Sequence, residues 1–411
     1  ASVTGSGDIS TASSGFTASG AVSGSDITIN AGTSSANFTD QITSSSTLTV
    51  SSSGLSINGT VNASNDALFD ATTGDAVFNN IILVDDGVLE IKGNNIFQNS
   101  TLDTLNGDIA VSASGSYTMN SAVSTQAAGG GLTVNSTGIM NLETITSQND
   151  INLTSESDSI NFNAGVNSVA GSLIVTAGNS IDIGGNQAVD QNIEIKTLNG
   201  GIVQNAVLTS EQGNISLDSS QGISMGRASS SNSLSGNIVY LAANNIDASL
   251  LTAMDDNVAV TSTNGAINDN NDSDTNFSAS SVTLSAVNGI GGNNVIETRV
   301  ASMNIHNSGS GIINLTNSGD LTIDALKNSG VTGDITITND VDFHLNAGSI
   351  DAGYDTGDLF MQTVNGDFLG MGSIPDFSHA DITARTAVFL GLNGSFGSTR
   401  PLRPLVLNIR D

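Results

Sequence analysis

The tripeptide Ile151-Asn152-Leu153 places a polar residue between two apolar ones, and the pattern returns in Ile215-Ser216-Leu217 and Ile335-Thr336-Ile337. A period of two with branched aliphatic residues is typical of a strand that buries one side. Other copies are Ile27-Thr28-Ile29, Ile109-Ala110-Val111 and Leu321-Thr322-Ile323. No segment keeps the helical period for three turns, so the sequence predicts an all-β protein.

The predicted strands recur at a nearly constant interval. Their first apolar residues follow one another at steps of 18 to 24 residues: Ile9, Ile27, Leu48, Leu68, Leu89, Ile109, Leu132, Ile151, Leu173, Ile193, Ile215, Ile238, Val258, Val282 and Met303. A second apolar position follows in most units, and a looser third one fills the remaining gap. The sequence therefore predicts a right-handed single-stranded parallel β-helix, triangular in cross-section, with about 19 coils of roughly 22 residues.

The predicted solenoid has no visible internal boundary. Neither a linker nor a break in composition interrupts the repeat, so one domain covering residues 1–411 is expected. The register is expected to be less regular after about residue 305, where the spacing of the apolar residues becomes uneven.

Charge and composition narrow the range of partners. The 411 residues include 9 Lys and Arg against 39 Asp and Glu, a formal net charge of −30. Such an acidic protein repels phosphate groups, so nucleic acid is not an expected partner. The absence of Cys excludes a disulfide framework and Cys-ligated metal sites. No apolar stretch approaches the roughly 18 residues of a membrane span, so none is expected.

Asparagine and glycine occupy regular places between the predicted strands. Six Asn-Gly pairs lie between predicted strands: Asn106-Gly107, Asn199-Gly200, Asn264-Gly265, Asn288-Gly289, Asn365-Gly366 and Asn393-Gly394. Both residue types tolerate positive φ, which a sharp corner is expected to need. In four successive coils an Asn directly precedes the first strand: Asn192, Asn214, Asn237 and Asn257. These predict a stacked amide ladder, the alternative being a chance run of turn residues.

One acidic loop has part of a calcium-binding pattern. Asp269, Asp272, Asp274 and Asn276 supply oxygen ligands near the start of an EF-hand-like loop. The pattern then breaks, because Phe277 stands in place of the required glycine and Thr283 in place of the required bidentate glutamate. Ca²⁺ is therefore a possible ligand at this loop, and no other cofactor is expected.

Two further groups of residues have side chains suited to metal binding or catalysis. Asp334, Asp358 and Asp381 each precede a late strand and are expected to stack one coil apart, either around Ca²⁺ or as solvated corner residues. His306, His344 and His379 are widely separated and have no partner at metal-ligand spacing, which favours outward-facing surface histidines. The sequence predicts no catalytic residue.

Two segments carry a family resemblance: Thr283-Leu284-Ser285-Ala286-Val287-Asn288-Gly289-Ile290-Gly291 and Ile312-Ile313-Asn314-Leu315-Thr316-Asn317-Ser318-Gly319-Asp320-Leu321-Thr322-Ile323. They resemble the repeats of filamentous-haemagglutinin-like large exoproteins, most closely between about residues 280 and 410. The resemblance implies a right-handed parallel β-helix and a bacterial adhesin exported by two-partner secretion. The Asn-Pro-Asn motifs of that family's secretion domain do not occur here, and no binding residue carries over.

These observations predict a non-enzymatic structural or adhesin rod, secreted or on the bacterial cell surface. Its expected partners are a receptor or glycan on a host or neighbouring cell, or copies of the chain joined end to end into a fibre. The alternative is a β-helix enzyme that degrades polysaccharide. An enzyme of that kind would need paired carboxylates on one face of the solenoid.

Overall fold

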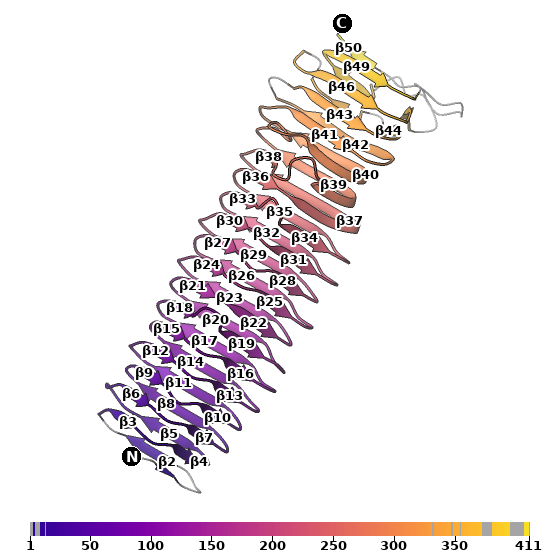
Figure 1. Cartoon of the computed structure of the whole chain (residues 1–411). Coiled ribbons are helices and arrows are strands. Elements are labelled where there is room, and N and C mark those ends of the chain that lie inside the picture. Colours follow the sequence, from indigo (N-terminus) through magenta and orange to yellow (C-terminus); the bar gives the residue numbers. More distant parts are fainter. Residues whose placement is uncertain are drawn as a thin grey trace. The chain divides into compact units, whose positions relative to one another are not determined.

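The computed structural model describes residues 3–4, 9–12, 14–330, 333–346, 348–353, 355–371, 380–394 and 407–410. Within these residues the secondary structure consists of strands, with no helix. The chain divides into two compact units, Ala1–Gly200 and Gly201–Asp411. Each unit is a stack of parallel coils, which confirms the predicted β-solenoid fold (Figure 1). The prediction of a single domain stays a prediction.

The first unit has three sheet faces, each made by one strand from every coil. Face A contains β2 (Ile9–Ala12), β5 (Ile27–Asn30), β8 (Leu48–Ser52), β11 (Ala67–Ala71), β14 (Leu89–Gly93), β17 (Ile109–Ala113), β20 (Leu132–Ser136), β23 (Ile151–Ser155), β26 (Leu173–Ala177) and β29 (Ile193–Thr197). Face B contains β3 (Phe16–Ala18), β6 (Ala36–Phe38), β9 (Leu55–Ile57), β12 (Ala76–Phe78), β15 (Ile96–Gln98), β18 (Tyr117–Met119), β21 (Met140–Leu142), β24 (Ile160–Phe162) and β27 (Ile181–Ile183). Face C contains β1 (Val3–Thr4), β4 (Val22–Gly24), β7 (Ile42–Ser44), β10 (Val61–Ala63), β13 (Ile82–Val84), β16 (Leu102–Thr104), β19 (Ser124–Ala127), β22 (Thr144–Ser147), β25 (Val166–Ser168) and β28 (Gln187–Val189).

The second unit begins with three faces of the same kind, which are given the same letters. They contain β32 (Ile215–Ser219) and β35 (Ile238–Ala242) in face A, β30 (Ile202–Gln204), β33 (Ile223–Met225), β36 (Ile246–Ala248) and β38 (Ile267–Asp269) in face B, and β31 (Val207–Ser210) and β34 (Ser230–Ser233) in face C. Three long strands then run from face C into face A: β37 (Leu250–Ser262), β39 (Phe277–Ala286) and β40 (Ile296–Asn307). The pairing of β37 with β39 shifts register between Ala253 and Asn257.

The last coils of the second unit pair differently. The strands β41 (Ile313–Asn317), β43 (Ile335–Asn339), β46 (Asp358–Thr363) and β49 (Thr386–Gly391) stack in one row. The long strand β42 (Leu321–Asn328) supports two rows, of which the first continues through β44 (Phe343–Leu345) and β47 (Phe368–Gly370). The second continues through β45 (Ile350–Asp351), β48 (Ile382–Ala384) and β50 (Leu407–Ile409).

In-register stacking of aliphatic residues forms the core of each unit. In the first unit Ile109, Leu132, Ile151, Leu173 and Ile193 follow one another in neighbouring strands, and all are buried. In the second unit the equivalent row is Ile215, Ile238, Val258, Val282 and Met303. Full burial of such a side chain contributes about 1.5–3 kcal/mol. The alternation of apolar and polar residues in the sequence therefore specifies which side chains pack in the core.

Buried polar groups at the coil corners are satisfied by side-chain hydrogen bonds. In the first unit, hydroxyls bond turn carbonyls, as when Ser136 Oγ donates to Gly138 O at 2.6 Å. In the second unit, buried asparagines bond one another: Asn307 Nδ2 donates to Asn328 Oδ1 at 3.0 Å, and Asn317 Nδ2 donates to Asn339 Oδ1 at 3.1 Å. These bonds offset the cost of burying polar atoms.

The Asn-Gly turns use glycine for a reason that differs from the predicted one. Of their six glycines only Gly289 has a positive φ, of 106°. A Cβ on Gly107 would lie 1.5 Å from the carbonyl oxygen of Gly87 in the preceding coil. One on Gly366 would lie 2.1 Å from the carbonyl carbon of Val341. The prediction of positive φ was thus wrong for five of the six turns, because close contact between stacked coils excludes a side chain there.

Candidate functional site

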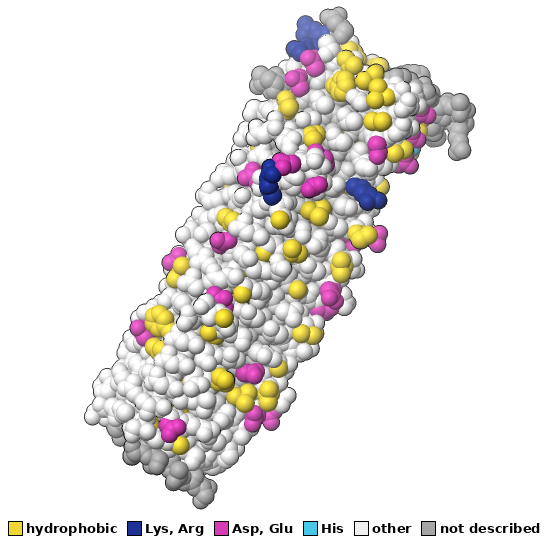
Figure 2. Space-filling view, in the orientation of Figure 1, with side chains coloured by type: hydrophobic (Ala, Val, Ile, Leu, Met, Phe, Trp, Pro, Cys, Tyr) yellow, Lys and Arg dark blue, Asp and Glu magenta, His cyan; other side chains and the backbone are white. Residues whose placement is uncertain are grey.

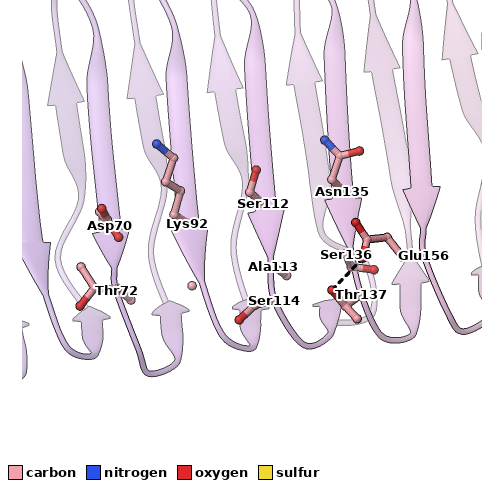
Figure 3. Close-up of a pocket in the computed structure, with 12 residues that line it drawn as sticks. Asp70, Thr72, Lys92, Ser112, Ala113, Ser114, Asn135, Ser136, Thr137 and Glu156 are labelled. Carbon is pink, nitrogen blue, oxygen red and sulfur yellow. Dashed lines mark hydrogen bonds between the residues drawn. The ribbon is translucent and has the colours of Figure 1, made fainter.

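An open groove of about 400 Å³ runs across several coils of the first unit, where the face A strands end (Figure 3). Most of its lining residues are polar, with hydroxyl, amide and charged side chains from successive coils. They are Asp70, Thr72, Lys92, Ser112, Ser114, Asn135, Ser136, Thr137 and Glu156.

Strand register brings these distant residues into one row. Asp70 on β11 pairs with Lys92 on β14, Lys92 with Ser112 on β17, and Ser112 with Asn135 on β20. Side chains at these positions face outward, because the residues on either side of them in each strand point into the core. One polar side chain per coil therefore lies along the groove, at intervals of about 4.8 Å.

Lys92 is the cation of the groove. Its Nζ lies 2.7 Å from Glu90 Oε1, and about two fifths of its side chain is exposed. The hydrogen bond to Glu90 raises the pKa of Lys92, and the nearby charge of Asp70 adds to this, while burial opposes it. Farther along, Thr137 Oγ1 donates to Glu156 Oε2 at 3.4 Å (Figure 3). The ammonium group is thus held between acidic neighbours and stays charged at neutral pH.

The two carboxylates of this lining are far apart. Asp70 and Glu156 lie four coils from each other, which corresponds to roughly 19 Å at the usual strand spacing. Paired carboxylates that cleave glycosidic bonds stand about 5–9.5 Å apart. The groove therefore offers a row of hydrogen-bonding groups to an extended ligand, without such a pair in its lining.

A second open groove, of about 470 Å³, lies in the second unit on face B and its flanking turns. Its lining includes turns that contain glycine and few charged groups, and the side chain of Val203 is exposed in its wall. Asp247 in this lining accepts a hydrogen bond from Asn268 Nδ2 at 2.8 Å. The surface facing the viewer in Figure 2 is likewise mostly neutral, with scattered acidic groups and isolated Lys and Arg side chains.

The predicted calcium loop is closed by its own amides. Asp269 Oδ1 accepts hydrogen bonds from the Asn271 backbone N–H at 2.8 Å and from Asn276 Nδ2 at 2.7 Å. Asp272 instead forms an ion pair with Arg227, and the Asp274 N–H donates to Asn271 O at 3.4 Å. These contacts explain how the loop is held, and calcium binding there stays a prediction.

Glu297 is a neighbour of this loop that the sequence reasoning missed. Its backbone N–H donates to Asn276 Oδ1 at 2.9 Å, and its buried Oε2 has no hydrogen-bond partner in the described part of the chain. Burial raises the pKa of Glu297 to about 7, and the charges of Asp269 and Asp274 contribute. The sequence does not show that Glu297 lies beside this loop, because the two are brought together only when the strands stack.

The expected stack of three late aspartates was wrong. Asp334 Oδ1 does accept the Asp358 N–H at 2.9 Å. The next residue in that row is Thr386, however, because β46 pairs with β49. Asp381 is buried in another row, where its carbonyl oxygen accepts the Ile350 N–H. Arg385 donates to Asp358 Oδ1 at 3.0 Å and to Oδ2 at 2.6 Å, so a cation balances the two stacked carboxylates.

The four asparagines of the predicted ladder fall in both units. In the second unit Asn237 Nδ2 donates to Asn214 Oδ1 at 3.4 Å, and Asn257 Nδ2 donates to Asn237 Oδ1 at 3.1 Å. Ser281 Oγ then donates to Asn257 Oδ1. In the first unit the Asn192 backbone N–H donates to Ser172 Oγ at 3.3 Å.

A second amide ladder, which the sequence reasoning missed, lies in the first unit. Asn79 Nδ2 donates to Asn58 Oδ1, and Asn99 Nδ2 donates to Asn79 Oδ1, each at 2.7 Å. Its signal in the sequence is an Asn directly after each of the three face B strands β9, β12 and β15, at steps of 21 and 20 residues.

The histidines lie apart in the fold. His306 is exposed on β40, and His344 is half-buried on β44. His379 lies outside the described residues.

Comparison with known proteins yields no relative: no protein-family model, curated protein or solved structure matches this chain. Among the residues that the structure describes, no helix is long and apolar enough to cross a membrane.

Proposed function

We propose that this chain is a non-enzymatic structural and adhesive segment of a secreted or cell-surface bacterial protein, and that it binds an extended glycan. The observation that carries the proposal is the groove of the first unit, in which Asp70, Lys92, Ser112 and Asn135 stand in register, one per coil. An extended sugar chain has a similar repeat of hydroxyl groups, so successive residues of the ligand meet successive coils.

The composition of the groove suits binding to hydroxyl groups. Hydroxyl and amide side chains donate and accept hydrogen bonds, and Lys92 adds a charged donor. The resemblance of residues 283–291 and 312–323 to haemagglutinin-like repeats supports the same class of function. The wide separation of Asp70 and Glu156 favours binding over cleavage. A polysaccharide-degrading enzyme is the alternative that the experiment must address.

The test is binding of the full chain to a panel of immobilised neutral and acidic polysaccharides. We expect at least one neutral glycan to bind and Lys92→Ala to weaken that binding roughly tenfold, as expected for loss of one charged hydrogen bond. The matched control is Lys196→Ala, because Lys196 occupies the same outward row on β29 but lies outside the groove lining. The control variant should bind like the wild type.

Two outcomes would contradict the proposal. If no glycan on the panel binds, or if both lysine variants bind equally, the groove is not the adhesive surface. If incubation with a bound glycan releases new reducing ends or unsaturated products, the chain is an enzyme. Circular dichroism of both variants checks that each retains the β-rich fold.

A further inference from the structure

Two carboxylates and an imidazole meet on the surface of the second unit. The side chains of Asp320, Asp342 and His344 each offer a ligand atom, and these atoms all lie within 4.8 Å of one another. Asp320 is exposed, whereas Asp342 and His344 are half-buried. The cluster lies outside both grooves and outside the predicted calcium loop.

Strand register creates this cluster from two coils. Leu321 on β42 pairs with Phe343 on β44, and Thr322 pairs with His344. Asp320 and Asp342 directly precede these two strands, so they stack one coil apart. Asp342 and His344 are two residues apart along one strand direction, which places both side chains on the outward face. Phe343 between them is buried and anchors the strand.

The carboxylate stack differs from the others in how its charge is balanced. Asp334 and Asp358 have Arg385 beside them. For Asp320 and Asp342, by contrast, the described part of the chain provides no Lys or Arg ion pair. Asp342 Oδ1 accepts the Asp367 N–H at 2.7 Å, which adds a third carboxylate residue on the next coil. Two like charges at this spacing repel each other unless a cation lies between them.

We propose that Asp320, Asp342 and His344 bind a divalent transition-metal ion of the zinc type. Carboxylate oxygens and imidazole nitrogens bind Zn²⁺ at about 2.0–2.2 Å, so small side-chain rotations bring the three ligand atoms together around one ion. The imidazole favours zinc over calcium, which prefers oxygen ligands alone. Three protein ligands leave a fourth position open to water or to a group from a partner. The bound ion joins two successive coils and neutralises the stacked carboxylates. This proposal does not depend on the glycan-binding function.

The test is a titration of the metal-free full chain with ZnCl₂ by isothermal calorimetry, with CaCl₂ as a parallel arm. We expect one zinc site whose dissociation constant rises roughly tenfold or more in His344→Gln and in Asp320→Asn. Excess Ca²⁺ should not displace the zinc. Zinc should also raise the thermal unfolding midpoint of the wild type, and that rise should be absent from His344→Gln.

Matched histidine variants make the result specific. His306→Gln removes an exposed histidine on β40 that is not part of the cluster. This variant should bind zinc like the wild type. Equal zinc binding in His344→Gln and His306→Gln would overturn the proposal, as would a site that Ca²⁺ fills with the same affinity as Zn²⁺. Thermal unfolding without metal shows whether each variant folds.

Discussion

The two units place their carboxylates differently. From β5 to β26 in the first unit the residue before the face A strand is Asp in alternate coils, at Asp26, Asp66, Asp108 and Asp150. The intervening coils carry Thr47, Val88, Gly131 and Ser172. Each aspartate accepts the backbone N–H of the residue above it, at 2.8–3.1 Å. Between Asp26 and Ser172 these carboxylates thus serve as turn acceptors, and no two of them stack directly on one another.

In the second unit carboxylates occur on successive coils. Asp320 and Asp342 stack near His344, and Asp334 and Asp358 stack beside Arg385. Glu297 lies near the acidic loop that contains Asp269 and Asp274. Stacked carboxylates about 4.8 Å apart repel each other, so they need a counter-charge or a shifted pKa. Carboxylates on alternate coils therefore indicate a structural role as hydrogen-bond acceptors. Carboxylates on successive coils indicate sites whose charge must be balanced in another way.

We expect the largest effect on the free energy of unfolding from removing the charge of Glu297. Because burial raises the pKa of Glu297 above its usual value of 4.5 to about 7, the stability associated with its neutral form is present below pH 4.5 and is lost as the pH rises through 7. At pH 8 we expect Glu297→Gln to be more stable than the wild type by about 1–2 kcal/mol, after allowance for solvent screening. Urea unfolding between pH 4 and 8 measures this difference.

The control for that prediction is Glu194→Gln, which removes an exposed carboxylate from β29 in the first unit. It should unfold like the wild type at every pH. If the wild type and Glu297→Gln keep a constant stability difference from pH 4 to 8, Glu297 does not titrate as described.

The second prediction concerns a variant that disrupts the alternation of aspartates before the face A strands of the first unit. Ser172→Asp places a carboxylate directly above Asp150 and should lower the free energy of unfolding by about 1 kcal/mol at pH 7 and low salt. The loss should shrink at high salt and at acidic pH, where carboxylates are screened or protonated. Ser172→Asn keeps an acceptor for the Asn192 N–H without the charge and should be nearly neutral. Equal effects of the two substitutions would mean that the alternation has no electrostatic basis.

The smallest expected effect concerns the amide ladder. Asn237→Ala removes the acceptor for Asn257 and the donor to Asn214, and because both hydrogen bonds are exposed to solvent we expect a loss of about 0.5 kcal/mol. Asn304→Ala changes an exposed asparagine on β40 that has no ladder contact in the described structure. Chemical denaturation of both variants should separate them. A loss as large in Asn304→Ala would assign the effect to asparagine in general.

Buried tyrosines show a feature that the two units share. Tyr117 donates to Gln98 in the first unit, and Tyr240 donates to Gln204 Oε1 at 2.6 Å in the second. Burial raises the pKa of both phenols, so they remain neutral donors at neutral pH. The sequence analysis did not predict a polar partner for either tyrosine. A partner such as Gln98 comes from the coil below and is visible only after the coils are aligned.

The sequence was sufficient for the repeat and for the core. Alternation in segments such as Ile151-Asn152-Leu153 specifies which side chains point inward, and their spacing specifies parallel stacking. The sequence did not predict the position of Asp381. The strand that follows it, β48, pairs with β45, whereas β46 pairs with β49. The groove was missed as well, although Asp70, Lys92 and Ser112 follow at steps of 22 and 20 residues. Those steps are ordinary repeat spacing and do not mark a groove by themselves.

The sequence alone thus determined the class of fold, because a period of two within a period of about 22 residues admits one way to bury the aliphatic rows. The tertiary structure decided which polar groups meet. Outward positions carry no apolar constraint, so their neighbours depend on the length of each corner and on small register shifts such as the one between Met303 and Asn304. The pairing of β42 with β44 brings Asp320, Asp342 and His344 together, and strand pairing alone could reveal it.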